Sequence, residues 1–182
     1  KIDHIRPLID YGHLDYGENK VQEAYEKWNN IKIENKNIKL HLIGRLQTNK
    51  VKIAVKLFDY IHSLDSKKLA DKISEQQKEH DLNVKLFIQV NIGEELQKSG
   101  IHEYELIDFY KYCKSLNLNI IGLMCIPPFN EESEKYFIRM KELNKKIGLS
   151  ELSMGMSSDY LKAIENSATF VRIGSDIFGQ RN

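Results

Sequence analysis

Short apolar runs alternate with amphipathic stretches along almost the whole sequence, and this alternation limits the fold more than any other feature. The apolar runs predict seven strands, at 13–19, 40–44, 60–65, 84–91, 119–126, 151–157 and 169–174. Between them, apolar residues recur three or four positions apart, a spacing typical of helices that pack on one face. Strands that alternate with helices of this size form right-handed β–α–β units, so we expect an α/β protein with a parallel sheet.

The number of strands favours a barrel over an open, doubly wound sheet. The sequence opens on a predicted helix, so we expect one more strand ahead of Lys1, and seven strands plus one make a TIM-type (β/α)8 barrel. A doubly wound sheet usually carries a glycine-rich phosphate loop after its first strand, and this sequence has none. We therefore expect residues 1–182 to form a single barrel domain whose first strand is missing from the given sequence.

Composition and charge argue against several classes of partner. Lys and Arg number 27 against 26 Asp and Glu, so the net charge of +1 gives no electrostatic reason to expect nucleic acid or an anionic membrane as a partner. No apolar run approaches the roughly 20 residues of a membrane span. Cys113 and Cys125 lack metal-ligand spacing and are predicted to be buried thiols in a reducing compartment. We expect a cytoplasmic protein, most simply a monomer.

The residues that end the last two predicted strands suit a phosphate group. In 170–179, Arg172 is followed by Gly174 and Ser175, and strand 151–157 ends at Ser157. Glycine lets the backbone approach an anion, and serine offers both an N–H and a hydroxyl. A Gly-Ser pair alone is more typical of a turn. However, barrels commonly bind phosphate in the loops after their last two strands, so the two loops together predict a phosphorylated ligand.

Longer motifs closely resemble those of the pyridoxal phosphate homeostasis proteins. They include Asp-Tyr-Gly-Glu-Asn at 15–19 and Val-Arg-Ile-Gly-Ser at 171–175, with others at 21–23, 41–50, 98–100, 122–124, 153–157 and 177–179. Members of this family look like the barrel domain of alanine racemase standing alone. They bind pyridoxal 5′-phosphate (PLP) as a Schiff base and are associated with the balance of intracellular vitamin B6 and amino-acid pools, with no established turnover. The resemblance implies the same fold and role here.

The resemblance also implies a set of cofactor-binding residues, and no catalytic residue is expected. Ser157, Gly174 and Ser175 would bind the phosphate through N–H and hydroxyl groups. Asn19 would lie by the ring face or its 3-hydroxyl, and Met156 would pack nearby. The six histidines show no i, i+4 pairing, so a metal site is not expected.

By the same resemblance, Arg172 would face the pyridine nitrogen of PLP. A guanidinium only donates hydrogen bonds, so it keeps that nitrogen unprotonated and makes the ring a poorer electron sink. In the family the Schiff-base lysine ends the first barrel strand, in a Val-Ser-Lys-Thr-like motif that this sequence does not contain. We therefore expect that lysine upstream of Lys1, and expect the given chain to bind PLP without a covalent bond.

The function implied is that of a PLP carrier or regulator, with PLP-dependent apo-enzymes as candidate recipients. The chain is too short for the second domain that supplies the other catalytic base in alanine racemase, so efficient racemisation is not expected. Two alternatives stay open. One is a PLP-dependent racemase or another phosphate-binding barrel isomerase or lyase, in which Asp65 would pair with Asn91 or His62. The other is an interaction protein that binds no phosphate. His41 is expected to make a structural hydrogen bond rather than to bind a ligand.

Overall fold

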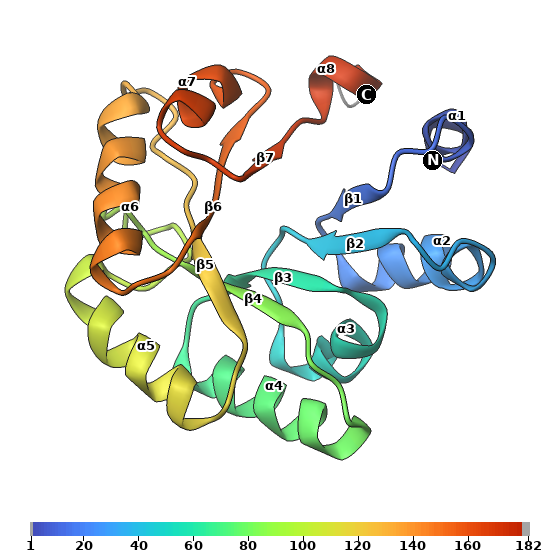
Figure 1. Ribbon diagram of the computed structural model, residues 1–182, viewed down its shortest axis with the longest axis horizontal. Helices are drawn as coiled ribbons and strands as arrows, with labels where there is room; N and C mark the ends of the chain where they lie inside the picture. The colour runs from blue at the N-terminus through green and yellow to red at the C-terminus, as the bar shows by residue number, and fades with distance from the viewer. Residues whose placement is uncertain (1, 180–182) are drawn as a thin grey trace.

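Seven strands form one parallel sheet in the computed structural model, which describes residues 2–179 (Figure 1). Each lies within, or within one residue of, a run predicted from the sequence, and most are shorter at both ends. The strands are β1 (Asp15–Glu18), β2 (Lys39–Leu42), β3 (Tyr60–Leu64), β4 (Lys85–Gln89), β5 (Ile120–Met124), β6 (Glu151–Met156) and β7 (Phe170–Arg172).

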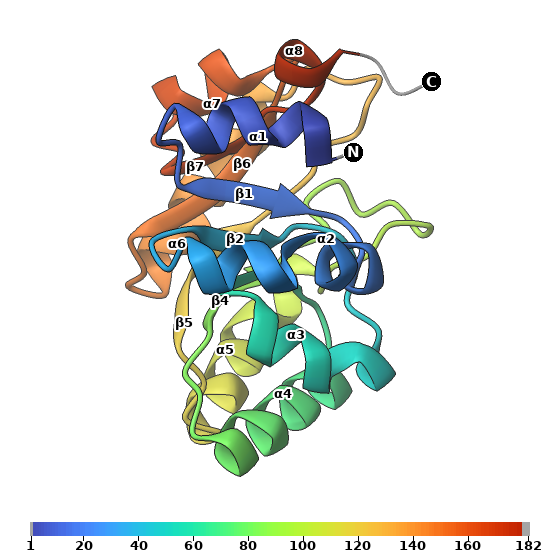
Figure 2. The same cartoon turned by 90° about the vertical axis from the view of Figure 1, so that its right-hand side faces the viewer.

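Helices connect successive strands on the outer side of the sheet, and one further helix precedes the first strand and another follows the last (Figures 1 and 2). Gly12, at φ +94°, ends the first of them in the left-handed conformation that glycine adopts without strain. The helices are α1 (Ile2–Asp10), α2 (Val21–Glu34), α3 (Val51–Leu57), α4 (Lys67–His80), α5 (Leu106–Ser115), α6 (Glu134–Lys146), α7 (Tyr160–Glu165) and α8 (Ser175–Phe178), with 3-10 turns at Thr48–Lys50 and Glu103–Glu105.

The strand order identifies the sheet as a nearly closed barrel. Every neighbouring pair is parallel, and the order runs from β1 to β7 without a reversal. A doubly wound sheet would reverse its order at a switch point, so the barrel prediction is confirmed. Within residues 2–179, β1 and β7 each have one neighbour, and the barrel is open between them (Figure 1). The expected eighth strand lies ahead of Lys1 and so outside the described residues.

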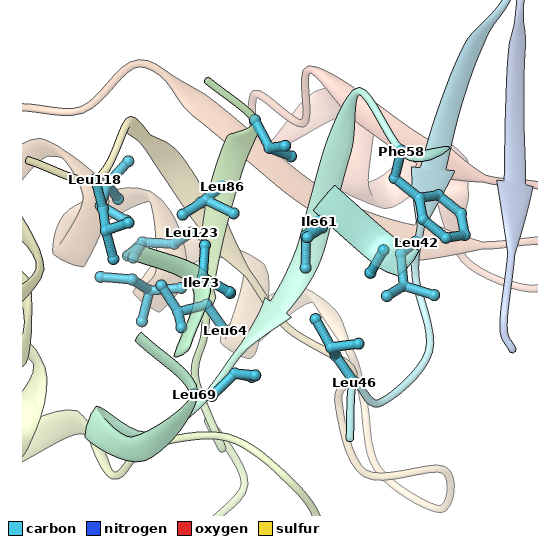
Figure 3. Packing of buried hydrophobic residues seen from close by; sticks show 14 of the residues in the cluster. Leu42, Leu46, Phe58, Ile61, Leu64, Leu69, Ile73, Leu86, Leu118 and Leu123 are labelled. Atoms are coloured by element: carbon cyan, nitrogen blue, oxygen red, sulfur yellow. The ribbon is translucent and has the colours of Figure 1, made fainter. Parts of the chain in front are cut away.

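The main hydrophobic core lies between the sheet and its outer helices (Figure 3). Leu40 and Leu42 of β2 are fully buried in it, and so are apolar residues of α3 and α4, such as Ala54 and Ile73. Each fully buried leucine contributes roughly 1.5–3 kcal/mol to folding. Because side chains alternate along a strand, the residues between these leucines point into the barrel.

Two further sequence predictions can be judged on the fold. Cys113 and Cys125 are both buried and unpaired, as predicted. Burial raises the pKa of each thiol to about 12, which makes both thiols unreactive at neutral pH. Among residues 2–179, no helix has the length and apolar character that crossing a membrane requires.

Candidate functional site

The turn after β6 and the turn after β7 are joined directly, at the carboxyl end of the barrel. The backbone N–H of Gly174 donates to Oγ of Ser157, with 3.2 Å between the atoms. The register of β6 against β7 shifts just before this turn, and Gly155 allows the bend because it adopts φ +91°. A β-carbon at Gly174 would meet no atom within 4 Å, so the backbone there faces open space. Two of the three predicted phosphate-binding residues are thus in contact.

The other predicted residues on these two strands lie close by. Ser175 is exposed at the start of α8, with Oγ 3.5 Å from Oδ1 of Asp176. Met156 is the register partner of Arg172 across the β6–β7 pair, and its side chain is 38% exposed. Its backbone N–H donates to Oδ1 of Asp159 over 2.7 Å, which closes the turn after β6. Five of the six predicted residues are therefore gathered on β6, β7 and the turns that follow them.

The sixth predicted residue, Asn19, lies across the opening of the barrel, just after β1. It is exposed, and its backbone lies against Gly44, two residues after the end of β2. A β-carbon at Gly44 would lie 2.2 Å from the carbonyl oxygen of Asn19, so only glycine fits at position 44. Asn19 and the β7 residues thus flank the same gap, from its two edge strands.

Arg172 lies deeper in the barrel than the serines and is bound at two points. Its Nη1 donates to Oγ of Ser153 and its Nη2 donates to the carbonyl oxygen of Cys125, each over 2.8 Å. Burial lowers the pKa of the guanidinium, but arginine stays charged at any physiological pH. Both of these partners are neutral. Among the described residues, these two bonds use two of the five N–H donors of Arg172, so the guanidinium is held in place and can still donate to a ligand.

Below Arg172, aromatic rings and imidazoles fill the barrel. The ring of His62 stacks on Phe87, and that of His41 stacks on Tyr60, each with 4.3 Å between centroids. Phe170 of β7 packs against all four of these rings. Since β7 is not a sheet neighbour of β2, β3 or β4, these contacts must cross the interior.

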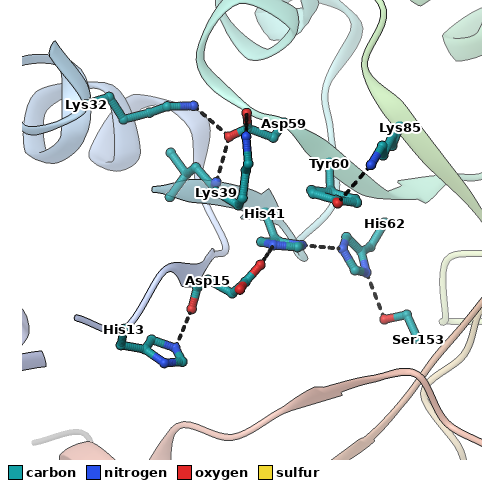
Figure 4. A network of polar contacts seen from close by, with 11 residues as sticks. His13, Asp15, Lys32, Lys39, His41, Asp59, Tyr60, His62, Lys85 and Ser153 are labelled. Atoms are coloured by element: carbon teal, nitrogen blue, oxygen red, sulfur yellow. Dashed lines mark hydrogen bonds and ion pairs between the residues drawn. The ribbon is translucent and has the colours of Figure 1, made fainter. Parts of the chain in front are cut away.

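A line of hydrogen bonds runs through these rings (Figure 4). Oδ1 of Asp15 lies 3.0 Å from Nε2 of His41, and Nδ1 of His41 lies 3.0 Å from Nε2 of His62. Nδ1 of His62 lies 2.7 Å from Oγ of Ser153, which also accepts from Arg172. The prediction of a structural hydrogen bond for His41 is confirmed. The link through His62 and Ser153 to Arg172 was missed, because these residues are 91 and 19 positions apart in the sequence.

Burial sets the charge state of both imidazoles. The pKa of His62 lies well below its ordinary value, because burial penalises the charged form and because His41 and Arg172 repel a proton. Burial also lowers the pKa of His41, although the carboxylate of Asp15 acts in the opposite direction. Both rings are therefore neutral at physiological pH.

The acid and base pairs considered from the sequence are not assembled in residues 2–179. The amide of Asn91 is bonded to the backbone of Glu95 at both of its polar atoms, and His62 bonds to His41 and Ser153. Asp65 is half-buried at the end of β3, where burial raises its pKa and Arg45 opposes that shift. No hydrogen bond joins Asp65 to Asn91 or His62 there, nor does any group of three His, Cys, Asp or Glu side chains suit a metal ion.

Comparisons with known proteins agree with this geometry. The sequence model of the alanine racemase N-terminal domain matches residues 3–182. A protein of Aquifex aeolicus named pyridoxal phosphate homeostasis protein is 41% identical over 187 residues, which cover 97% of this chain and 81% of that protein. A human protein of the same name is 38% identical, over 99% of this chain and 73% of its own length.

Solved structures give the same result. The structure of PipY from Synechococcus elongatus with PLP bound has a TM-score of 0.89 and 33% identity, and covers 98% of this chain and 87% of that one. An alanine racemase of Clostridium difficile, at 13% identity, shares the fold with a TM-score of 0.75 over 99% of this chain and 48% of the racemase. The resemblance drawn from the sequence motifs is thus confirmed. The chain belongs to the family of the alanine racemase N-terminal domain, among the pyridoxal phosphate homeostasis proteins.

Proposed function

We propose that this protein binds PLP at the carboxyl end of its barrel and acts in PLP and amino-acid homeostasis, as a carrier or regulator of the cofactor rather than as an enzyme. The observation that carries the proposal is the layout along β7 and the neighbouring turn. A charged guanidinium is held inside the barrel at Arg172, and a hydroxyl and backbone N–H groups are gathered at the rim by Ser157 and Gly174.

The donor set fits PLP chemically. Ser157, Gly174 and Ser175 offer neutral N–H and hydroxyl donors of the kind that bind phosphate, next to backbone in open space. Arg172 offers a donor that cannot accept, which suits an unprotonated pyridine nitrogen. PLP itself supplies an electrophilic aldehyde and an electron-accepting ring. The bound PLP in the PipY structure, at 33% identity, supports this assignment.

Two features support a role without turnover. Proton-transfer chemistry at an amino-acid carbon needs an acid or base on each face of the substrate. Among residues 2–179, the candidate Asp65 has no such partner in Asn91 or His62, which bond elsewhere. Arg172 would also leave the pyridine nitrogen unprotonated, which weakens the ring as an electron sink. The relatives are named for homeostasis rather than for a reaction.

The binding test compares PLP with pyridoxal, which lacks the phosphate, by equilibrium dialysis. We expect Ser157→Ala to weaken PLP binding by tenfold or more, since a hydrogen bond to a charged group is worth about 1.5–3 kcal/mol. Pyridoxal affinity should not change. Ser150→Ala, at the opposite end of β6, is the matched control and should affect neither ligand. Equal affinity of the native protein for both ligands would refute the phosphate site.

The turnover test incubates the PLP-saturated protein with L-alanine and with L-serine and measures the D-enantiomers. We expect no racemisation above that of free PLP, and rates typical of enzymes would overturn the carrier proposal in favour of a racemase. We propose further that the protein is a single-domain monomer of the cytoplasm that passes PLP to apo-enzymes. Its two buried, unpaired thiols suit a reducing compartment.

A further inference from the structure

The hydrogen bonds inside the barrel form one continuous line from Asp15 to Arg172, of which Figure 4 shows the part from Asp15 to Ser153. It passes through His41, His62 and Ser153, and its four distances lie between 2.7 and 3.0 Å. The five residues come from β1, β2, β3, β6 and β7, so the line crosses the barrel from one edge strand to the other. The proposed function uses only its last member.

With both imidazoles neutral, the chemistry of the end groups fixes the direction of every bond. The carboxylate of Asp15 can only accept, so His41 donates from Nε2 and its Nδ1 carries a lone pair. His62 must then donate from Nε2 to His41, which leaves its own Nδ1 as an acceptor. Ser153 consequently donates to His62 and accepts from Arg172, which can only donate. Each donor therefore points away from Arg172 and toward Asp15.

Removal of either imidazole or of the serine hydroxyl would leave a buried partner unpaired. His41, His62 and Ser153 are at most 5% exposed, so water cannot easily replace a lost member. The neutral state on which the direction depends follows from burial, which lowers the pKa of both histidines. The three inner members, His41, His62 and Ser153, are therefore buried and paired at every side-chain polar atom, as in networks that fix a single side-chain geometry.

We propose that Ser153 and His62, supported by His41 and Asp15, are positioning residues that hold the guanidinium of Arg172 in place for the pyridine nitrogen of the ligand. The contact of Arg172 with the ligand rests on the proposed function, whereas the line of hydrogen bonds and its direction rest on the structure alone. Two points fix the plane of the guanidinium, Oγ of Ser153 and the carbonyl oxygen of Cys125. Without Ser153 the plane could turn about a single contact.

The first experiment needs no variant and no ligand. Long-range nitrogen–proton NMR of the native protein at pH 7 reports which ring nitrogen of each histidine carries the proton. We expect both His41 and His62 to be neutral and protonated at Nε2. A proton on Nδ1 of either ring, or a doubly protonated ring, would refute the direction assigned to the hydrogen bonds between Arg172 and Asp15.

The second experiment tests the positioning role with two ligands, PLP and its analogue that has carbon in place of the ring nitrogen. Ser153→Ala should weaken PLP binding by roughly tenfold, the effect of losing one hydrogen bond to a charged group. The affinity for the carbon analogue should stay the same, because that ring gives Arg172 no acceptor. An equal loss for both ligands, or no loss for either, would overturn the positioning role.

Ser63→Ala is the matched control, because it makes the same chemical change on β3 next to His62. Ser63 is 1% exposed and its Oγ has no hydrogen-bond partner within residues 2–179, so both affinities should match the native protein. The two failures remain distinct. If the native protein bound no PLP, the proposed function and the positioning of Arg172 for a ligand would both be refuted. The NMR result would still decide the direction of the hydrogen bonds.

Discussion

At the scale of single residues, two buried neutral histidines are the least expected feature of this barrel. His41 faces Asp15, Asp59, Lys32, the ring of Tyr60 and His62. His62 faces His41 and Arg172, together with the neutral groups of Ser153, Phe87 and Phe170. Among the described residues that shift these pKa values, only the two aspartates favour a proton on either ring. Folding therefore holds both imidazoles in the neutral form.

This charge state predicts a loss of stability in mild acid. In the unfolded chain both histidines titrate near 6.5, and in the folded protein their pKa values are lower. Below pH 6.5 the unfolded state therefore binds protons that the folded state does not, and the free energy of unfolding falls with falling pH. Each fully linked histidine contributes about 1.36 kcal/mol per pH unit, until the pH drops below its folded pKa.

Urea denaturation between pH 7 and pH 5 measures this effect. We expect His62→Phe, which can still stack on Phe87, to reduce the slope of the unfolding free energy against pH, although it lowers stability at pH 7. His4→Gln, at an exposed position of α1, should leave the slope unchanged. A native protein whose stability is constant over this range would contradict the buried neutral state.

The sequence could point to some site residues and not to others, for a physical reason. Arg172, Gly174 and Ser175 stand together in one short motif, so their chemistry is visible locally, although their roles remain predictions. His62 and Ser153 are 91 residues apart and meet only because β3 and β6 face each other across the barrel. Strand alternation places both side chains inward, but it does not say which inward residues touch.

At the scale of elements, the joint between β1 and α2 depends on one buried carboxylate, that of Glu18. The carboxylate of Glu18 accepts from the indole Nε1 of Trp28 over 2.7 Å and from Nζ of Lys27 over 2.6 Å. Trp28 is fully buried, and Glu18 is 9% exposed. Both partners lie on α2, so Glu18 faces the outer layer and fastens that helix to the strand.

Glu18→Ala should destabilise the protein by about 2–3 kcal/mol, because it leaves the buried indole N–H of Trp28 without an acceptor. Glu18→Gln should cost less, since an amide oxygen can still accept that bond. Glu26→Ala, at an exposed position of the same helix, is the control and should stay within about 0.5 kcal/mol of the native protein. Urea denaturation gives the three values, and an equal loss for the two Glu18 variants would contradict the acceptor role.

Element boundaries depended on contacts that local patterns do not show. The apolar spacing of 100–116 predicts a helix from Gly100, but α5 begins at Leu106. Ile101 instead forms a bridge with Val90, and its N–H and carbonyl bond to Gln89 and Asn91. His102 and Glu105 then cap the 3-10 turn that leads into α5. The bridge between Ile101 and Val90, which is a tertiary contact, therefore replaces the helix that the apolar spacing predicts at the start of this segment.

At the scale of the whole molecule, the order of the seven strands could be predicted but the closure of the barrel could not. Alternating strands and helices give a parallel sheet, and the barrel favoured by the strand count places neighbouring strands in sequence order, which is the order in the structure. Closure depends on strand tilt and on whether a further strand joins the two edges, which are properties of the complete sheet. Within residues 2–179 the edges are β1 and β7, and the predicted ligand residues lie on or just after them.

The open edges predict an uneven pattern of hydrogen exchange. Strand β4 pairs with β3 and β5, and Leu86, Phe87 and Ile88 in it are fully buried, so its amides should exchange slowest. Within residues 2–179, strands β1 and β7 pair on one side only, and every residue of β7 is partly exposed, so these strands should exchange fastest. Peptide-level exchange followed by mass spectrometry compares the three strands in one experiment.

A longer chain carrying the expected upstream strand provides the decisive comparison. If that strand lies between β1 and β7, it supplies hydrogen-bond partners to both, and exchange should slow there while β4 stays unchanged as the internal control. If β1 and β7 of the 182-residue chain are already as protected as β4, something else covers the edges. A second copy of the chain would be the simplest cover, and protection that rises with protein concentration would then refute the proposed monomer.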